Sequence, residues 1–85
     1  METLINNIEC TYRYRMYVLK QKFHELYLEK QQAIEDLNQL GNTQNISPYY
    51  YQAQFIILTT LIDILNVKME NVNEKIKNIK YEIGN

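Results

Sequence analysis

The sequence predicts an all-α protein that folds as an antiparallel, coiled-coil-like helical hairpin. Two observations support this prediction. Apolar residues recur at alternating spacings of four and three in both halves of the chain, and a short polar segment separates the halves. A spacing that averages about 3.5 residues places side chains along one side of an α-helix, where they pack lengthwise against another helix. The length of 85 residues suits a single domain, residues 1–85.

The first helix is expected over about residues 2–40. Its apolar line, which we call the first seam, consists of Ile5, Ile8, Tyr12, Met16, Leu19, Phe23, Leu26, Ala33 or Ile34, Leu37 and Leu40. Lys30 falls on the same line, and its alkyl stem can pack while its ammonium group reaches water. Gly41 follows the last apolar position, where a residue in the left-handed conformation commonly ends a helix.

The turn is expected over residues 41–47. Ser47 is a favoured N-cap residue, and Pro48 suits the first helical position because its missing N–H would have no partner there. Ile46 and Tyr51 occupy the two positions of a hydrophobic staple, one before the cap and one on the fourth helical residue. These signals together predict where the second helix begins.

The second helix is expected from Pro48 to about Ile83, with Gly84 closing it. The second seam consists of Tyr51, Phe55, Leu58, Ile62, Leu65, Met69, Val72, Ile76, Ile79 and Ile83. Both helices would be roughly 54–58 Å long at 1.5 Å per residue. Matched lengths and a short loop favour an antiparallel pair, with residue i near residue 88 − i, within about one turn of helix.

The chain has more apolar residues than two seams can use. Leaving a large aliphatic side chain exposed forgoes roughly 1.5–3 kcal/mol, so the surplus predicts an interface. The expected interface residues are Tyr14, Tyr17, Val18, Leu28, Ile57, Leu61 and Ile64. The simplest partner is a second copy, which gives a homodimer that forms a four-helix bundle. An unidentified protein is the second expected partner.

The function expected from this pattern is that of a non-enzymatic protein interaction module, such as a small adaptor, chaperone or inhibitor. The chain has one His, His24, and one Cys, Cys10, which cannot form a zinc site within one chain. Ser47, the only Ser, is explained by its capping position, and both Gly residues fall at helix ends. We therefore expect no catalytic residue, no metal and no cofactor.

Two alternatives remain open. Arg residues alternate with Tyr over residues 12–15, and such a pattern can stack on bases and hold phosphates. The candidate nucleic-acid contacts are Arg13, Arg15, Lys20 and Lys22. A net charge of −1 and the absence of a known nucleic-acid-binding motif place this reading second. The other alternative is a structural scaffold, because the terminal end of the hairpin is net basic and the turn end net acidic.

The cellular setting is expected to be the cytoplasm, and a host cytoplasm if the chain is viral. A single Cys suits a reducing compartment. The most apolar window, residues 55–67, is too short to span a bilayer and contains Asp63. Ile, Asn, Tyr and Lys are abundant, a bias that favours an AT-rich bacterial or viral genome.

Overall fold

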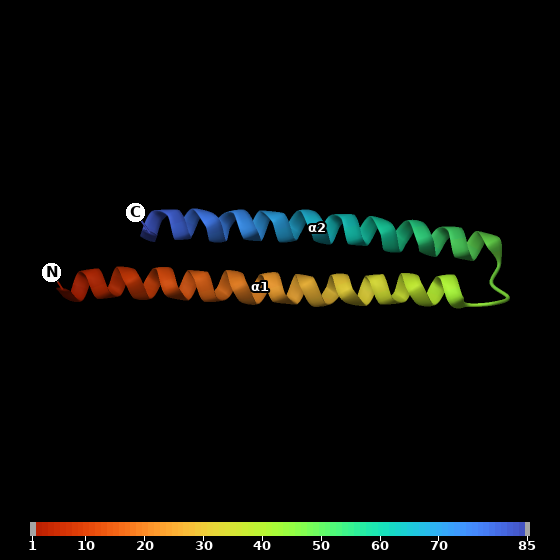
Figure 1. Cartoon of the computed structure of the whole chain (residues 1–85), viewed down its shortest axis with the longest axis horizontal. Coiled ribbons are helices and arrows are strands. Elements are labelled where there is room, and N and C mark those ends of the chain that lie inside the picture. Colours follow the sequence, from red (N-terminus) through yellow and green to blue (C-terminus); the bar gives the residue numbers. More distant parts are fainter. Residues whose placement is uncertain (1, 85) are drawn as a thin grey trace.

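The computed structural model describes the backbone of residues 2–84 and the side chains of residues 11–82. The chain forms two helices, α1 (Glu2–Asn42) and α2 (Pro48–Gly84), and no strand occurs between residues 2 and 84. The helices lie side by side in opposite directions, so both termini are at one end and the turn is at the other (Figure 1). The rod measures 69 × 14 × 14 Å. The predicted helical hairpin is confirmed.

The core lies between the two helices and is built from the predicted seams. The buried apolar residues are Leu26, Ala33 and Leu40 of α1 and Leu65, Val72, Ile76 and Ile79 of α2. Met16, Leu19, Phe23 and Met69 pack against the middle of this core. Lys30 is half-buried, as expected for a packed stem. The seam residues Ile5, Ile8 and Ile83 lie outside the described side chains.

The register of the two helices follows the predicted pairing. Phe23 lines one surface hollow together with Asn66. Tyr14 lines another hollow together with Lys75, nearer the termini. Both pairs lie within about one helical turn of the rule that residue i faces residue 88 − i. The short turn therefore sets a register that persists to the terminal end of the rod.

The second seam departs from the prediction near the turn. Tyr51 and Phe55 are 42% and 44% exposed, and their rings stack with centroids 6.2 Å apart and an interplanar angle of 13°. Gln54 is half-buried in their place. The line stays buried or half-buried for two heptads on the other side of Leu65, as far as Ile79. The drift of a 3.5-residue line from a straight helix, about 20° per heptad, therefore shows only near the turn.

The end of α1 also differs from the prediction. Gly41 is helical, and the left-handed residue is Asn45, with φ of 65°. Asn is among the few residue types that adopt this conformation readily. The Thr43 hydroxyl donates to the Gln39 carbonyl at 2.7 Å, and the Thr43 N–H donates to the Leu40 carbonyl at 3.4 Å. These bonds satisfy carbonyls at the helix end, so a left-handed Gly41 is not needed.

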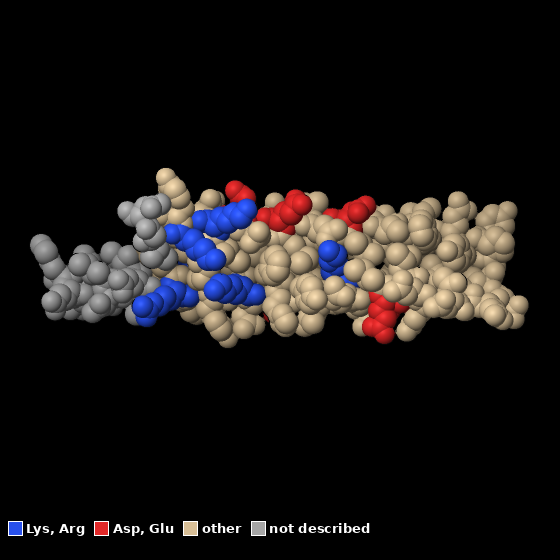
Figure 2. Space-filling view, viewed as in Figure 1, with Lys and Arg blue, Asp and Glu red and all other residues tan. Residues whose placement is uncertain are grey.

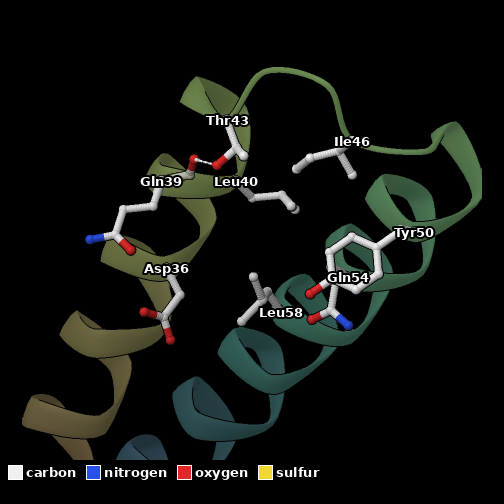
Figure 3. Close-up of a pocket in the computed structure, with 8 residues that line it drawn as sticks. All are labelled: Asp36, Gln39, Leu40, Thr43, Ile46, Tyr50, Gln54 and Leu58. Atoms are coloured by element: carbon white, nitrogen blue, oxygen red, sulfur yellow. Dashed lines mark hydrogen bonds between the residues drawn. The ribbon is translucent and has the colours of Figure 1, made fainter.

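The start of α2 agrees with the prediction at the cap. The Tyr51 N–H donates to the Ser47 carbonyl at 3.0 Å, which places Ser47 at the N-cap and Pro48 at the first helical position. Ile46 lines a hollow together with Tyr50 (Figure 3). Leu40 reaches this hollow from α1, so Ile46 joins the loop to the core.

The helical conformation of Gly41 leads to a first testable prediction. No atom lies within 4 Å of a Cβ added there, and Gly in a helix costs about 0.5–1 kcal/mol relative to Ala. Gly41→Ala should raise the free energy of unfolding by about 0.5 kcal/mol or more in urea titrations at fixed protein concentration. Asn45→Ala, the control, should lower it by about 1 kcal/mol because of the positive φ. Destabilisation by Gly41→Ala would contradict the helix end described here.

Candidate interaction surface

Large apolar side chains are exposed along most of the rod. Among the residues whose side chains the structure describes, fifteen large hydrophobic residues are exposed and seven hydrophobic residues are buried. All seven predicted interface residues belong to the exposed group, with exposed fractions between 40% for Leu61 and 69% for Tyr14. The hairpin alone therefore leaves many large apolar side chains partly in contact with water.

One side of α2 carries a continuous stripe beside the core. Its members, at alternating spacings of four and three, are Tyr50, Gln54, Ile57, Leu61, Ile64, Lys68, Asn71 and Lys75. Near the turn, Tyr50 shares a hollow with Asp36 of α1 (Figure 3). Near the termini, Lys75 shares a hollow with Val18 of α1. Asp36 and Val18 therefore lie on the same side of the hairpin as the α2 stripe.

A matching stripe on α1 joins these two hollows. Its members, at alternating spacings of three and four, are Arg15, Val18, Lys22, Glu25, Glu29, Gln32 and Asp36. Gln32 is held within the stripe, because its Nε2 donates to Asp36 Oδ1 at 2.9 Å. We call the two stripes together the Leu61 face. Tyr14 lies at its border, in the hollow lined by Val18 and Lys75.

Charge is segregated along the Leu61 face. The half nearer the termini carries the basic residues Arg15, Lys22, Lys68 and Lys75. The half nearer the turn carries the acidic residues Glu29 and Asp36, and Glu25 lies at the boundary between the halves. Glu82, one heptad beyond Lys75, is an acidic exception at the extreme end of the α2 line. The basic and acidic halves meet beside the apolar centre of the face, at Leu61 and Ile64.

The structure does not bring all the predicted interface residues together. Tyr17 lines a different hollow, with Arg13 and Lys20, on another side of α1. Leu28 follows Tyr17 by eleven residues, which is close to three helical turns, so both project from the same outer side. The predicted set therefore divides into residues on or beside the Leu61 face and the pair Tyr17 and Leu28 on the outside of α1.

The candidate nucleic-acid contacts also divide into two pairs. Arg13 and Lys20 line a hollow beside the seam residues Tyr12 and Met16, whereas Arg15 and Lys22 belong to the Leu61 face. The Arg15 guanidinium lies 5.7 Å from the centre of the Tyr12 ring, within the range of a cation–π contact. These four residues do not form one continuous basic patch, although Lys and Arg do gather toward the terminal end (Figure 2).

The turn end has a feature that the sequence reasoning missed. Residues 37–62 contain no Asp, Glu, Lys, Arg or His, and Figure 2 shows this end free of charged side chains on the visible side. We call this segment the uncharged tip. Tyr49 is 85% exposed there, and Tyr51, Phe55 and Ile56 are also exposed. The Thr59 hydroxyl donates to the Phe55 carbonyl at 2.7 Å. The absence of charged residues over residues 37–62 is the sequence signal from which this tip could have been predicted.

Comparisons with known proteins do not identify a function for this chain, so the function must be inferred from the surface described above. No protein-family model, no curated protein and no solved structure matches this chain. Among the residues that the structure describes, no group of three or more His, Cys, Asp and Glu side chains could hold a metal ion. Neither helix, over its described residues, has a stretch long and apolar enough to cross a membrane.

Proposed function

We propose that this protein is a non-enzymatic interaction module that self-associates and docks a partner protein through its apolar and Tyr-rich helix faces. The supporting observation is the set of large apolar side chains that the hairpin leaves exposed. Burial of Ile57, Leu61 and Ile64 would contribute roughly 1.5–3 kcal/mol for each side chain fully removed from water. That sum is comparable to the whole stability of a small domain. The lone Cys10 suits a reducing compartment such as the cytoplasm.

The exposed residues divide between the side of the rod and its end, and we assign the two roles accordingly. The Leu61 face runs along the rod, where a long, matching surface can cover it, so it serves self-association. The part of the uncharged tip outside the Leu61 face projects at the turn, where Tyr49 and Tyr51 can bury ring area and keep a hydrogen bond for their hydroxyls. The tip is the docking site for the partner protein.

Sedimentation equilibrium tests the self-association. The chain should be a dimer or larger at concentrations of about 10 μM. A dissociation constant of that size corresponds to about −7 kcal/mol, which burial of Ile57, Leu61 and Ile64 from both copies can supply. Its melting temperature should rise with protein concentration, since folding and association are linked. A monomer at every concentration, with a cooperative melt that does not depend on concentration, would contradict the proposal.

Site-specific crosslinking tests the docking role of the tip. A photoreactive residue in place of Tyr49 should crosslink to one protein in an extract of the source organism, and excess unlabelled wild type should compete. A competitor carrying Tyr51→Ser and Phe55→Ser should fail to compete while keeping its helix content, because both side chains are exposed. The same photoreactive group in place of Glu74, outside the tip, is the matched control. Equal competition by both competitors would exclude the tip.

A further inference from the structure

We propose that the Leu61 face binds the Leu61 face of a second copy, with the two rods antiparallel and the uncharged tips at opposite ends. This inference depends on the self-association proposed above and specifies its surface and direction. The arrangement is a closed two-fold dimer, in which the same residues contribute from both copies. Charge complementarity along the face is the observation that selects a second copy as the occupant.

The charges of α1 match an antiparallel copy of α1. Arg15 and Lys22 are seven residues apart, and Glu29 and Asp36 are also seven residues apart. When α1 lies antiparallel over the α1 of the second copy, placing Lys22 over Glu29 brings Arg15 over Asp36. The two-fold axis repeats both contacts, which gives four opposite-charge contacts across the dimer. Glu25 lies half a residue from the axis, so the two Glu25 carboxylates approach each other, and the four opposite-charge contacts must outweigh this like-charge contact. Such complementarity fixes the register and direction of association.

The α2 stripe can also pair with an antiparallel copy of itself. Counted outward from its centre, the intervals between successive members are the same in both directions. Leu61 then meets Ile64 of the second copy, and Ile57 meets the alkyl stem of Lys68. At the ends of the stripe, Tyr50 meets Lys75, a pairing suited to a cation–π contact. Along α2 the apolar contacts thus lie at the centre of the stripe, and its two lysines lie farther from the axis.

Both patterns require the same two-fold axis. The centre of the α1 charge pattern lies between Glu25 and Leu26, and the centre of the α2 stripe lies between Ile62 and Asp63. The hairpin register places these two points at the same height within about one turn of helix. The charge pattern of α1 and the apolar centre of the α2 stripe can therefore share one two-fold axis.

The parallel arrangement, with both tips at the same end, is disfavoured by the same charges. A face-to-face parallel dimer places α1 over the α2 of the second copy. Lys22 then approaches Lys68, and Arg15 approaches Lys75, so like charges meet at the basic half. Glu29 would meanwhile cover Leu61 and lose water without gaining a cation. The geometry points to the antiparallel dimer.

Charge-swapped chains test the face and the register. The first chain carries Arg15→Glu and Lys22→Glu, and the second carries Glu29→Lys and Asp36→Lys. Each chain alone replaces the four opposite-charge contacts with like-charge contacts, so its dimer dissociation constant should rise at least about tenfold. An equimolar mixture should regain wild-type affinity by forming a heterodimer. The mixture should also regain helix content if either chain alone unfolds as a monomer.

The matched control carries Arg13→Glu and Lys20→Glu. It makes the same change in net charge on another side of α1, and its dimer dissociation constant should stay within about twofold of the wild type, because surface charges away from an interface contribute little. Wild-type affinity in either charge-swapped chain alone, or failure of the mixture to recover, would overturn the proposed face and register.

Distance measurements between spin labels test the direction. A label on Gln44→Cys in a Cys10→Ala background marks the turn. In the antiparallel dimer the two labels should be on the order of 55 Å apart, from the helix rise and the position of the axis. In a parallel dimer they would be separated by a distance comparable to the 14 Å width of a rod. A short distance would overturn the direction but leave self-association intact, whereas a monomeric wild type would overturn both proposals.

Discussion

Leu65→Asp should unfold the hairpin at 25 °C. Leu65 is 1% exposed and lies in the middle of the core with Leu26, Val72 and Ile76. An Asp there would bury an unpaired charge, which costs at least about 3–5 kcal/mol, and would also remove the transfer energy of the Leu side chain. Small domains have roughly 5–15 kcal/mol of stability in total. Circular dichroism at 222 nm should therefore show loss of most of the helical signal.

Ile64→Asp is the matched control for this substitution. Ile64 is the neighbouring residue on the same helix, but 47% of its side chain is exposed. The same new charge at this position should leave the helix content of the folded chain intact and weaken self-association, because Ile64 lies at the centre of the Leu61 face. Unfolding by Ile64→Asp together with tolerance of Leu65→Asp would show that the inner and outer sides of α2 are assigned the wrong way round.

Leu26→Ala should produce the next largest loss of stability. Leu26 is 2% exposed and packs in the same core cluster. Truncation of a buried Leu to Ala costs about 2–5 kcal/mol, from lost transfer energy and from the cavity that remains. The urea midpoint should fall markedly, with the slope of the transition unchanged if the denatured state is unaltered.

Leu28→Ala is the control for the cavity effect. Leu28 is chemically identical but 53% exposed on the outer side of α1. Its truncation should change the free energy of unfolding by less than about 1 kcal/mol, as is usual for exposed positions. Equal destabilisation by Leu26→Ala and Leu28→Ala would mean that the outer side of α1 is also packed, for example against a second copy in a different arrangement.

The hairpin could be predicted from the sequence because one signal dominates it. Apolar residues at helical spacing run through both halves of the chain, and burial in the structure falls on those lines, from Leu26 and Ala33 in α1 to Ile76 and Ile79 in α2. The N-cap position of Ser47 was also predictable, since capping depends on the local residues alone. Lengthwise packing then follows, because no other arrangement buries both lines.

The details of the turn could not be predicted in the same way. Gly41 is a common helix terminator, but here Thr43 bonds back to the last turn and lets α1 continue to Asn42. The outward rotation of Tyr51 and Phe55 has a different cause. A 3.5-residue line stays on one side only if the helices supercoil, and the sequence alone does not reveal how far they do so.

The candidate surface was only partly predictable. The sequence indicates which apolar residues fall outside the seams, and the exposure of Ile57, Leu61 and Ile64 agrees with that. It does not show which residues of α1 share a side with them, because that grouping depends on the rotation of one helix against the other. The separation of Tyr17 and Leu28 from the Leu61 face could therefore not be predicted.

The connection between the helices, residues 43–47, acts as a tether that keeps each helix at a high effective concentration near the other. Because its backbone crosses no other element, proteolytic cleavage there should leave the packed helices unchanged. Their pairing would then become a bimolecular reaction, so the two fragments would dissociate on dilution. The stability of the cleaved rod would depend on fragment concentration, and a ligated or circularly permuted chain with a new linker between the termini should restore it.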